Sequence, residues 1–191
     1  MTTYRDLYQQ AQADSEGFWL DAAKSIDWVT PPTRALDASN PPFSRWFPDG
    51  ELNTCYNAVD RHVAAGRGDQ KAIIYDSPIT DSASTMSFSE LQTATALFAG
   101  MLARLGINKG DRVIIYMPMI PQSLVAMLGC ARLGAVHSVV FGGFAAAELA
   151  KRIDDAQPKA IISASCGHEP GRIVAYKPLL DEAIELASHK P

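Results

Sequence analysis

The spacing of apolar residues changes along the chain and predicts two parts of different character. From residue 71 onward, short apolar runs alternate with segments whose apolar residues recur at helical spacing. The run over residues 112–117 is almost continuously apolar, which is typical of a strand covered on both faces of a sheet. Strands and helices in alternation predict right-handed β–α–β crossovers. We therefore expect an α/β fold, with a partial parallel sheet and flanking helices. The expected strands cover residues 71–75, 85–88, 112–117, 136–140 and 159–164, and the expected helices cover residues 88–105, 121–134, 145–156 and 178–188.

Residues 1–66 are expected to form a helical and extended arm that precedes this fold. Tyr4 and Leu7 begin a helical apolar spacing, which Phe18 and Trp19 continue. Between Asp27 and Gly50, prolines break regular ladders while aromatic residues require burial. This combination predicts an ordered strip that lies across another surface, followed by a helix over residues 52–65. The prolines are Pro31, Pro32, Pro41, Pro42 and Pro48, and the aromatic residues are Trp28, Phe43, Trp46 and Phe47.

Composition and charge exclude several classes of function. The 17 Lys and Arg residues against 21 Asp and Glu residues give a net charge of −4, and the absence of a basic run argues against nucleic-acid binding. The longest apolar stretch, residues 117–134, is broken by prolines and an arginine, so we expect no membrane span. The N-terminus lacks the pattern of a secretory signal, and three widely spaced cysteines argue against a disulfide framework. A cytoplasmic location follows from these observations.

Two segments rich in glycine or proline each follow an expected strand and are candidates for binding an anion. The first leads into the next helix, whose free N–H groups favour negative charge. The second contains Arg172, whose guanidinium group suits phosphate. Because ligands bind at the carboxyl ends of parallel strands, one anionic ligand can touch both segments. A sterically required turn and a solvated arginine are the alternatives. The candidate residues are Phe141, Gly142, Gly143, Glu169, Pro170, Gly171 and Arg172.

Other motifs do not indicate catalysis or metal binding. Cys166 and His168 are two candidate ligands without a second pair, which does not make a zinc site. Asp154 and Asp155 are adjacent on an expected helix and therefore face apart. His137 lies in an apolar strand run and is interpreted as a semi-buried histidine. We therefore predict no catalytic residue and no metal ligand in this chain.

Several stretches together resemble the N-terminal part of the acetyl-CoA and propionyl-CoA synthetases. The resemblance covers essentially the whole chain, and such long joint matches rarely arise by chance. The last two stretches are closer to the propionate-type members than to the acetate-type ones. The stretches are Trp46-Phe47, Leu52-Asn53-x-x-Tyr56-Asn57-x-x-Asp60-Arg61-His62, Lys109-Gly110-Asp111-Arg112 through Pro121, residues 126–144, Ser163-Ala164-Ser165-Cys166-Gly167-x-Glu169-Pro170-Gly171-Arg172, and Tyr176-Lys177-Pro178 through Ala183.

The resemblance implies an AMP-forming ligase that uses ATP, coenzyme A and Mg²⁺ to activate a short-chain carboxylate. It places Phe141, Gly142 and Gly143 beside the adenine end of coenzyme A, and Arg172 on the coenzyme A phosphates. It also implies that residues 1–66 are the N-terminal arm and residues 67–191 the first part of the AMP-binding domain. Propionate is the expected acid. Acetate, or a stand-alone α/β binding module that uses the arm for interaction, are the alternatives.

The sequence departs from the family pattern in two ways. Acetate-type relatives tend to carry a second arginine at the position of Glu169, and a carboxylate does not bind phosphate. The phosphate loop, the acyl pocket and the catalytic lysine of the family would all lie after Pro191. We therefore expect this chain to be a truncated, amino-terminal third of the enzyme, which is inactive alone and has the remainder of its own chain as a partner.

Overall fold

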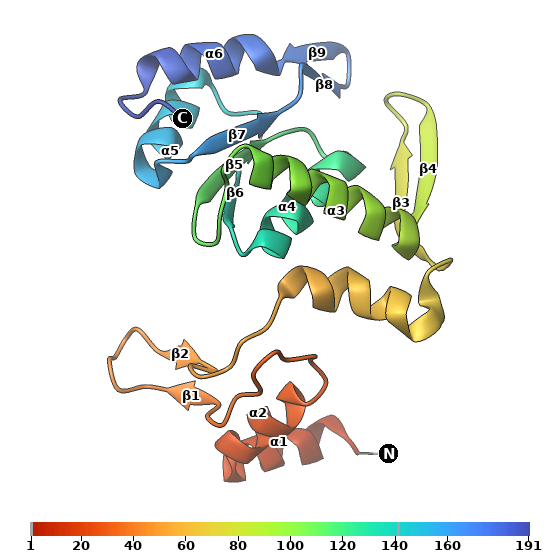
Figure 1. Cartoon of the computed structure of the whole chain (residues 1–191), viewed down its shortest axis with the longest axis vertical. Helices are drawn as coiled ribbons and strands as arrows, with labels where there is room; N and C mark the ends of the chain where they lie inside the picture. The colour runs from red at the N-terminus through yellow and green to blue at the C-terminus, as the bar shows by residue number, and fades with distance from the viewer. Residues whose placement is uncertain (1, 141) are drawn as a thin grey trace. The chain divides into compact units, whose positions relative to one another are not determined.

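The computed structural model describes residues 2–140 and 142–191 and divides into two units (Figure 1). The first unit ends at Asn53 and the second spans Thr54–Pro191. Within the first unit, helices α1 (Tyr4–Ala13) and α2 (Ser15–Ala23) are separated by Asp14. Asp14 interrupts the helical spacing because its carboxylate accepts a hydrogen bond from the Gly17 N–H at 2.9 Å and so caps the second helix.

The strip rich in proline and aromatic residues is ordered by short antiparallel contacts inside the first unit. Strand β1 (Leu36–Asp37) pairs with β2 (Arg45–Trp46), and Thr30 bridges to Glu51. Trp28, Trp46 and Phe47 pack on other aromatic rings, whereas Phe43 is 74% exposed, so the burial expected of the aromatic residues is not met throughout the strip. Trp28 meets Phe47 at 5.5 Å between ring centroids, and Trp19 meets Trp46 at 5.3 Å. The prediction that this segment is ordered is therefore confirmed, and its position across another surface stays a prediction.

The second unit begins with a helical segment at residues 54–67. The expected helix over residues 52–65 is present, but its hydrogen bonds are mostly of the π type, in η1 (Tyr56–Asp60) and η2 (Val63–Arg67). Cys55 and Val59 are fully buried on this segment and pack in one cluster with Leu91. Burial on one side thus fixes the segment, although its winding departs from the α-helix.

The strands expected at residues 71–75 and 85–88 are present, but they do not join the parallel sheet. They are β3 (Lys71–Ser77) and β4 (Ser82–Ser87), which pair with each other as an antiparallel hairpin. The expectation that residues 85–88 open the β–α–β alternation is therefore wrong. Only four residues separate the two strands, and a parallel pair needs a crossover of a dozen or more.

The parallel sheet has three strands in the order β6-β5-β7 and helices on both faces (Figure 1). On β5, Val113 packs in one cluster with residues of α3 and α4, whereas Ile114 and Tyr116 pack in another with residues of α5 and α6. The predicted α/β fold with a partial parallel sheet is confirmed. The elements are β5 (Arg112–Tyr116), β6 (Val136–Val140), β7 (Ala160–Ser163), α3 (Phe88–Arg104), α4 (Pro121–Leu133), α5 (Ala146–Ala156) and α6 (Tyr176–Leu186).

Strand β6 lies at an edge of this sheet, and its exposure corrects the interpretation of His137. The histidine is exposed rather than semi-buried, as are Val136 and Val139 on the same strand. An apolar run in a sequence does not distinguish an edge strand from a central one, because both carry the same residue types.

The described residues contain neither a membrane helix nor a cluster of metal ligands. None of the helices in residues 2–140 and 142–191 combines the length and apolar character that crossing a bilayer requires. The same residues contain no group of three His, Cys, Asp or Glu side chains able to hold a metal ion. The cysteines are free thiols, and burial raises the pKa of Cys130 to about 11.

Replacing Thr95 with valine should stabilise the chain by about 1 kcal/mol, because a buried hydroxyl without a partner costs free energy. Thr95 is fully buried on α3, and its Oγ1 has no hydrogen-bond partner among the described residues. Urea denaturation of the variant measures the change. Thr93→Val is the matched control, since the Thr93 side chain is exposed and already donates to the Ser89 carbonyl at 3.0 Å. A clear loss of stability in Thr95→Val would contradict the prediction.

Candidate functional site

The first candidate segment connects β6 to α5 at the carboxyl end of the parallel sheet. Gly142 is buried and Gly143 is exposed, whereas Phe141 lies outside the described residues. Ala145 precedes α5, and no side chain caps the helix among the described residues. The first N–H groups of α5 are therefore not used by a capping side chain, as an anion-binding turn requires.

The second candidate segment is a hairpin rather than the loop that the sequence suggested. Strand β8 (Cys166–Glu169) pairs antiparallel with β9 (Arg172–Ala175). Pro170 and Gly171 form the two-residue turn between them, and Gly171 adopts a positive φ of 74°. Glycine and proline therefore form a tight β-turn here. Amino-acid composition alone does not distinguish such a turn from an irregular loop.

The turn of this hairpin places Glu169 directly against Arg172. The guanidinium Nη2 lies 2.6 Å from Oε2 of the glutamate, and Nε donates to the same oxygen at 2.7 Å. The Arg172 side chain is 70% exposed, so the pair is screened by water and is worth only about 0–1 kcal/mol. A phosphate group can therefore compete with Glu169 for the arginine. Arg172 is therefore available to an anion only when its ion pair with Glu169 opens.

Tyr176, the first residue of α6, brings the two candidate segments together. A methyl group at Gly142 would overlap the Tyr176 hydroxyl, and its carbon would lie 2.5 and 2.7 Å from two ring carbons. On the other segment, a methyl group at Gly167 would lie 2.6 Å from another ring carbon of the same tyrosine. The ring is thus in contact with both backbones, and neither glycine can be enlarged without displacing it. No spacing in the sequence connects Tyr176 with these glycines.

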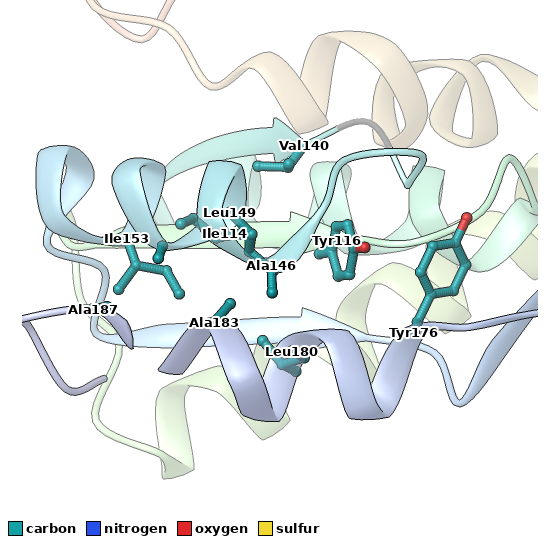
Figure 2. Close-up of a cluster of buried hydrophobic side chains, with 11 residues drawn as sticks. Ile114, Tyr116, Val140, Ala146, Leu149, Ile153, Tyr176, Leu180, Ala183 and Ala187 are labelled. Carbon is teal, nitrogen blue, oxygen red and sulfur yellow. The ribbon is translucent and has the colours of Figure 1, made fainter. Parts of the chain in front are cut away.

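Tyr116, the last residue of β5, contacts the β6–α5 turn from inside the sheet. Its hydroxyl donates a shared hydrogen bond to the carbonyls of Phe144, at 3.1 Å, and Gly142, at 3.4 Å. Its ring meets that of Tyr176 edge to face, at 5.0 Å between centroids. Figure 2 shows both tyrosines within the buried cluster between the sheet and helices α5 and α6. A phenol that ends an apolar strand is the signal that sequence reasoning overlooked.

Both tyrosines are held in their neutral form. Burial raises the pKa of Tyr116, and the neighbouring phenol of Tyr176 raises it further. Burial also raises the pKa of Tyr176, with a second contribution from the carboxylate of Glu169. Each phenol therefore keeps its proton at neutral pH and can act as a hydrogen-bond donor. Neither is suited to accept a proton from a substrate.

Basic side chains near these segments are paired with acidic ones. Lys177 lies within 2.6 Å of Asp181, and Arg152 lies 3.6 Å from Glu148. Arg152 also covers the ring of Phe144, at 4.2 Å from its centroid. Arg172 is paired with Glu169 in the same way. Each of these three basic side chains is therefore paired with a carboxylate, and an anion that binds Arg172 competes with Glu169.

Comparison with known proteins identifies the family of the chain. Residues 60–189 match the family described as AMP-binding enzyme, and residues 4–58 match the family described as acetyl-coenzyme A synthetase N-terminus. Acyl-CoA synthetase short-chain family member 3 of Rattus norvegicus, described as mitochondrial, is 52% identical over 98% of this chain and 28% of its own length. Acetyl-coenzyme A synthetase of Streptomyces avermitilis is 50% identical over 94% of this chain and 27% of its own length.

The two relatives differ in description but match the chain over nearly the same residues. The chain spans less than a third of the length of either relative. The predicted resemblance to short-chain acyl-CoA and acetyl-CoA synthetases is thus confirmed. Because the first family match covers most of the chain, the chain belongs to the AMP-binding enzyme family.

Proposed function

We propose that this chain is the N-terminal part of an AMP-forming acid–thiol ligase for short-chain carboxylic acids. In this reaction the carboxylate attacks the α-phosphate of ATP, which forms an acyl-adenylate and releases pyrophosphate. The thiol of coenzyme A then attacks the acyl carbon, the bond to AMP breaks, and the thioester forms. The observation that carries the proposal is the identity of about half of all residues to short-chain acyl-CoA and acetyl-CoA synthetases, over nearly the whole chain.

Within this ligase, the β6–α5 turn and the β8–β9 hairpin contribute to the coenzyme A site. Gly142 and Gly143 supply backbone at the end of a parallel strand, and Arg172 supplies a cation for a phosphate. Glu169 holds that cation until the ligand arrives, while Pro170 and Gly171 set the turn between them. Phe141 belongs to the same proposal by its resemblance alone. The support from the structure is that Tyr176 contacts both segments.

The proposed acid is propionate, with acetate as the second candidate. The stretches at residues 163–172 and 176–183 support propionate because they resemble propionate-type synthetases more closely than acetate-type ones. Mg²⁺ is proposed as the partner of ATP, where it would neutralise the triphosphate. Residues 1–66 are proposed to serve as the arm of the enzyme, and residues 67–191 as the first part of its adenylation domain.

Assay of the protein encoded by the complete reading frame tests this proposal. With ATP, Mg²⁺ and coenzyme A, kcat/KM should be about tenfold higher for propionate than for acetate, the order of discrimination that one methylene group supports. Butyrate and a reaction with excess EDTA serve as the other arms. Higher kcat/KM for acetate would overturn the choice of acid. Failure to form any acyl-adenylate, measured by pyrophosphate exchange with all three acids, would overturn the ligase itself.

We also propose a cytoplasmic location, which the free cysteines support because reduced thiols are typical of reducing compartments. The rat relative is described as mitochondrial, so the two compartments are the alternatives to separate. Fractionation of cells that express the complete protein from its own gene tests the location. Recovery with a mitochondrial matrix marker would contradict the proposal.

A further inference from the structure

We propose that Tyr116 and Tyr176 are positioning residues that fasten the β6–α5 turn to the β8–β9 hairpin, so that the two segments meet coenzyme A as one unit. The inference rests on the proposed function, because it concerns how that ligand is held. Neither tyrosine is offered as a catalytic residue. Both side chains are almost completely buried, at 0% exposure for Tyr116 and 5% for Tyr176.

The contacts of Tyr176 give the first reason. Its ring lies against Gly142 on one segment and Gly167 on the other, so a shift of either segment must move the same ring. Its backbone N–H donates to the Ser165 carbonyl at 3.0 Å, and the N–H of Lys177 donates to the same carbonyl at 3.2 Å. The base of the hairpin and the start of α6 are therefore joined by backbone as well as by packing.

The Tyr116 hydroxyl gives the second reason, because packing alone does not require it. A phenylalanine would fill the same space in the apolar cluster at the end of β5. The phenol instead directs its proton to carbonyls of Gly142 and Phe144, which belong to the candidate turn. Its hydrogen bond therefore holds the turn. A preorganised turn lowers the cost of ordering it when a ligand binds.

The test uses Tyr116→Phe in the protein encoded by the complete reading frame. Losing the hydrogen bond to the turn should raise the KM for coenzyme A about fivefold, since one hydrogen bond is worth about 1 kcal/mol. The rate of acyl-adenylate formation and the KM for ATP should change by less than about twofold, because the first step does not use coenzyme A. A purely structural role would instead move both steps together with the melting temperature.

A second variant, on the β8–β9 hairpin, disturbs the contact between Gly167 and the Tyr176 ring. Gly167→Ala adds a methyl group against the Tyr176 ring and should also raise the KM for coenzyme A selectively. Gly100→Ala is the matched control, because a methyl group at Gly100 meets nothing within 4 Å, and its KM values should not change.

The outcomes separate the inference from the proposed function. An unchanged KM for coenzyme A in both Tyr116→Phe and Gly167→Ala would overturn the positioning role, provided that the unmutated enzyme makes both adenylate and thioester. An equal fall in both steps would overturn it as well, in favour of a structural role. An unmutated enzyme that makes no adenylate would overturn the proposed function instead.

Discussion

Replacing Arg132 with alanine should lower the free energy of unfolding of the chain by about 3 kcal/mol, at the lower end of the cost of breaking a buried ion pair. Nη2 of Arg132 donates to both carboxylate oxygens of Asp60, at 2.8 and 2.7 Å. The two side chains are 27% and 14% exposed, so water cannot fully replace the lost partner. Gln92 also donates to Asp60, at 2.8 Å, and would still do so in the variant.

The size of this effect follows from the elements that the ion pair joins. Asp60 ends η1, Gln92 lies on α3 and Arg132 lies on α4. A carboxylate left without its cation in this place must either remain desolvated or draw water between these elements. Cys55, which is fully buried beside the pair, has its pKa raised chiefly by burial and would share the disturbed packing.

Urea denaturation followed by circular dichroism measures the change for Arg132→Ala. The control is Lys151→Ala, which removes a pair between Lys151 and Glu148 that is 72% and 44% exposed. Such an exposed pair should contribute less than about 0.5 kcal/mol. Equal losses of unfolding free energy in the two variants would show that partial burial does not make the Arg132–Asp60 pair more stabilising than an exposed pair. That result would contradict the prediction.

Local sequence signals predicted the helices and strands well because each depends on near neighbours. Pro121 begins α4 and Gly134, with a φ of 70°, ends it, as their conformational preferences require. The apolar run of β5 was predicted to be covered on both faces, and Val113 through Tyr116 are all fully buried. These elements are fixed by residues a few positions apart, so a single sequence contains the necessary information.

Pairing between strands was harder to predict, since strand composition does not name the partner strand. Residues 85–88 were expected next to the parallel sheet and instead pair with residues 71–77. Glycine and proline mark both irregular loops and tight hairpins. The segment around Arg172 is therefore predicted as a loop, although the structure has a hairpin there. For residues 85–88 the strand was predicted and only its partner was missed, whereas strands β8 and β9 were not predicted at all.

The candidate site depended on contacts between residues far apart in the chain. The sequence selected Gly142, Gly143 and Arg172 as candidates. The structure shows that Tyr176 contacts both the β6–α5 turn and the β8–β9 hairpin, on which these candidates lie. Tyr116 and Tyr176 are 60 positions apart, and each occupies an ordinary position at the end of a strand or the start of a helix. No spacing rule connects such residues, so only the folded chain reveals that they meet.

Replacing Arg172 with glutamine in the complete enzyme should raise the KM for coenzyme A about twentyfold, which corresponds to roughly 2 kcal/mol for hydrogen bonds to a charged group. The variant loses the cation and also leaves the Glu169 carboxylate, now without its partner at 2.6 Å, to repel an incoming phosphate. Because Arg172 is 70% exposed, salt should screen both effects. The increase should therefore shrink as ionic strength rises, while the KM for ATP and for the acid stays unchanged.

Glu169→Gln supplies the matched variant on the same hairpin and should act in the opposite direction. Its neutral amide frees Arg172 from an ion pair worth about 0–1 kcal/mol, so the KM for coenzyme A should fall about two- to threefold. Coenzyme A lacking its 3′-phosphate shows which phosphate Arg172 binds. If Arg172 binds the 3′-phosphate, the Arg172→Gln substitution should have little effect on the KM for this analogue.

A KM for coenzyme A that neither substitution changes would show that this hairpin lies away from the ligand. Because Glu169 and Arg172 neutralise each other in the free chain, opposite shifts for the two variants are the result that a competing phosphate requires.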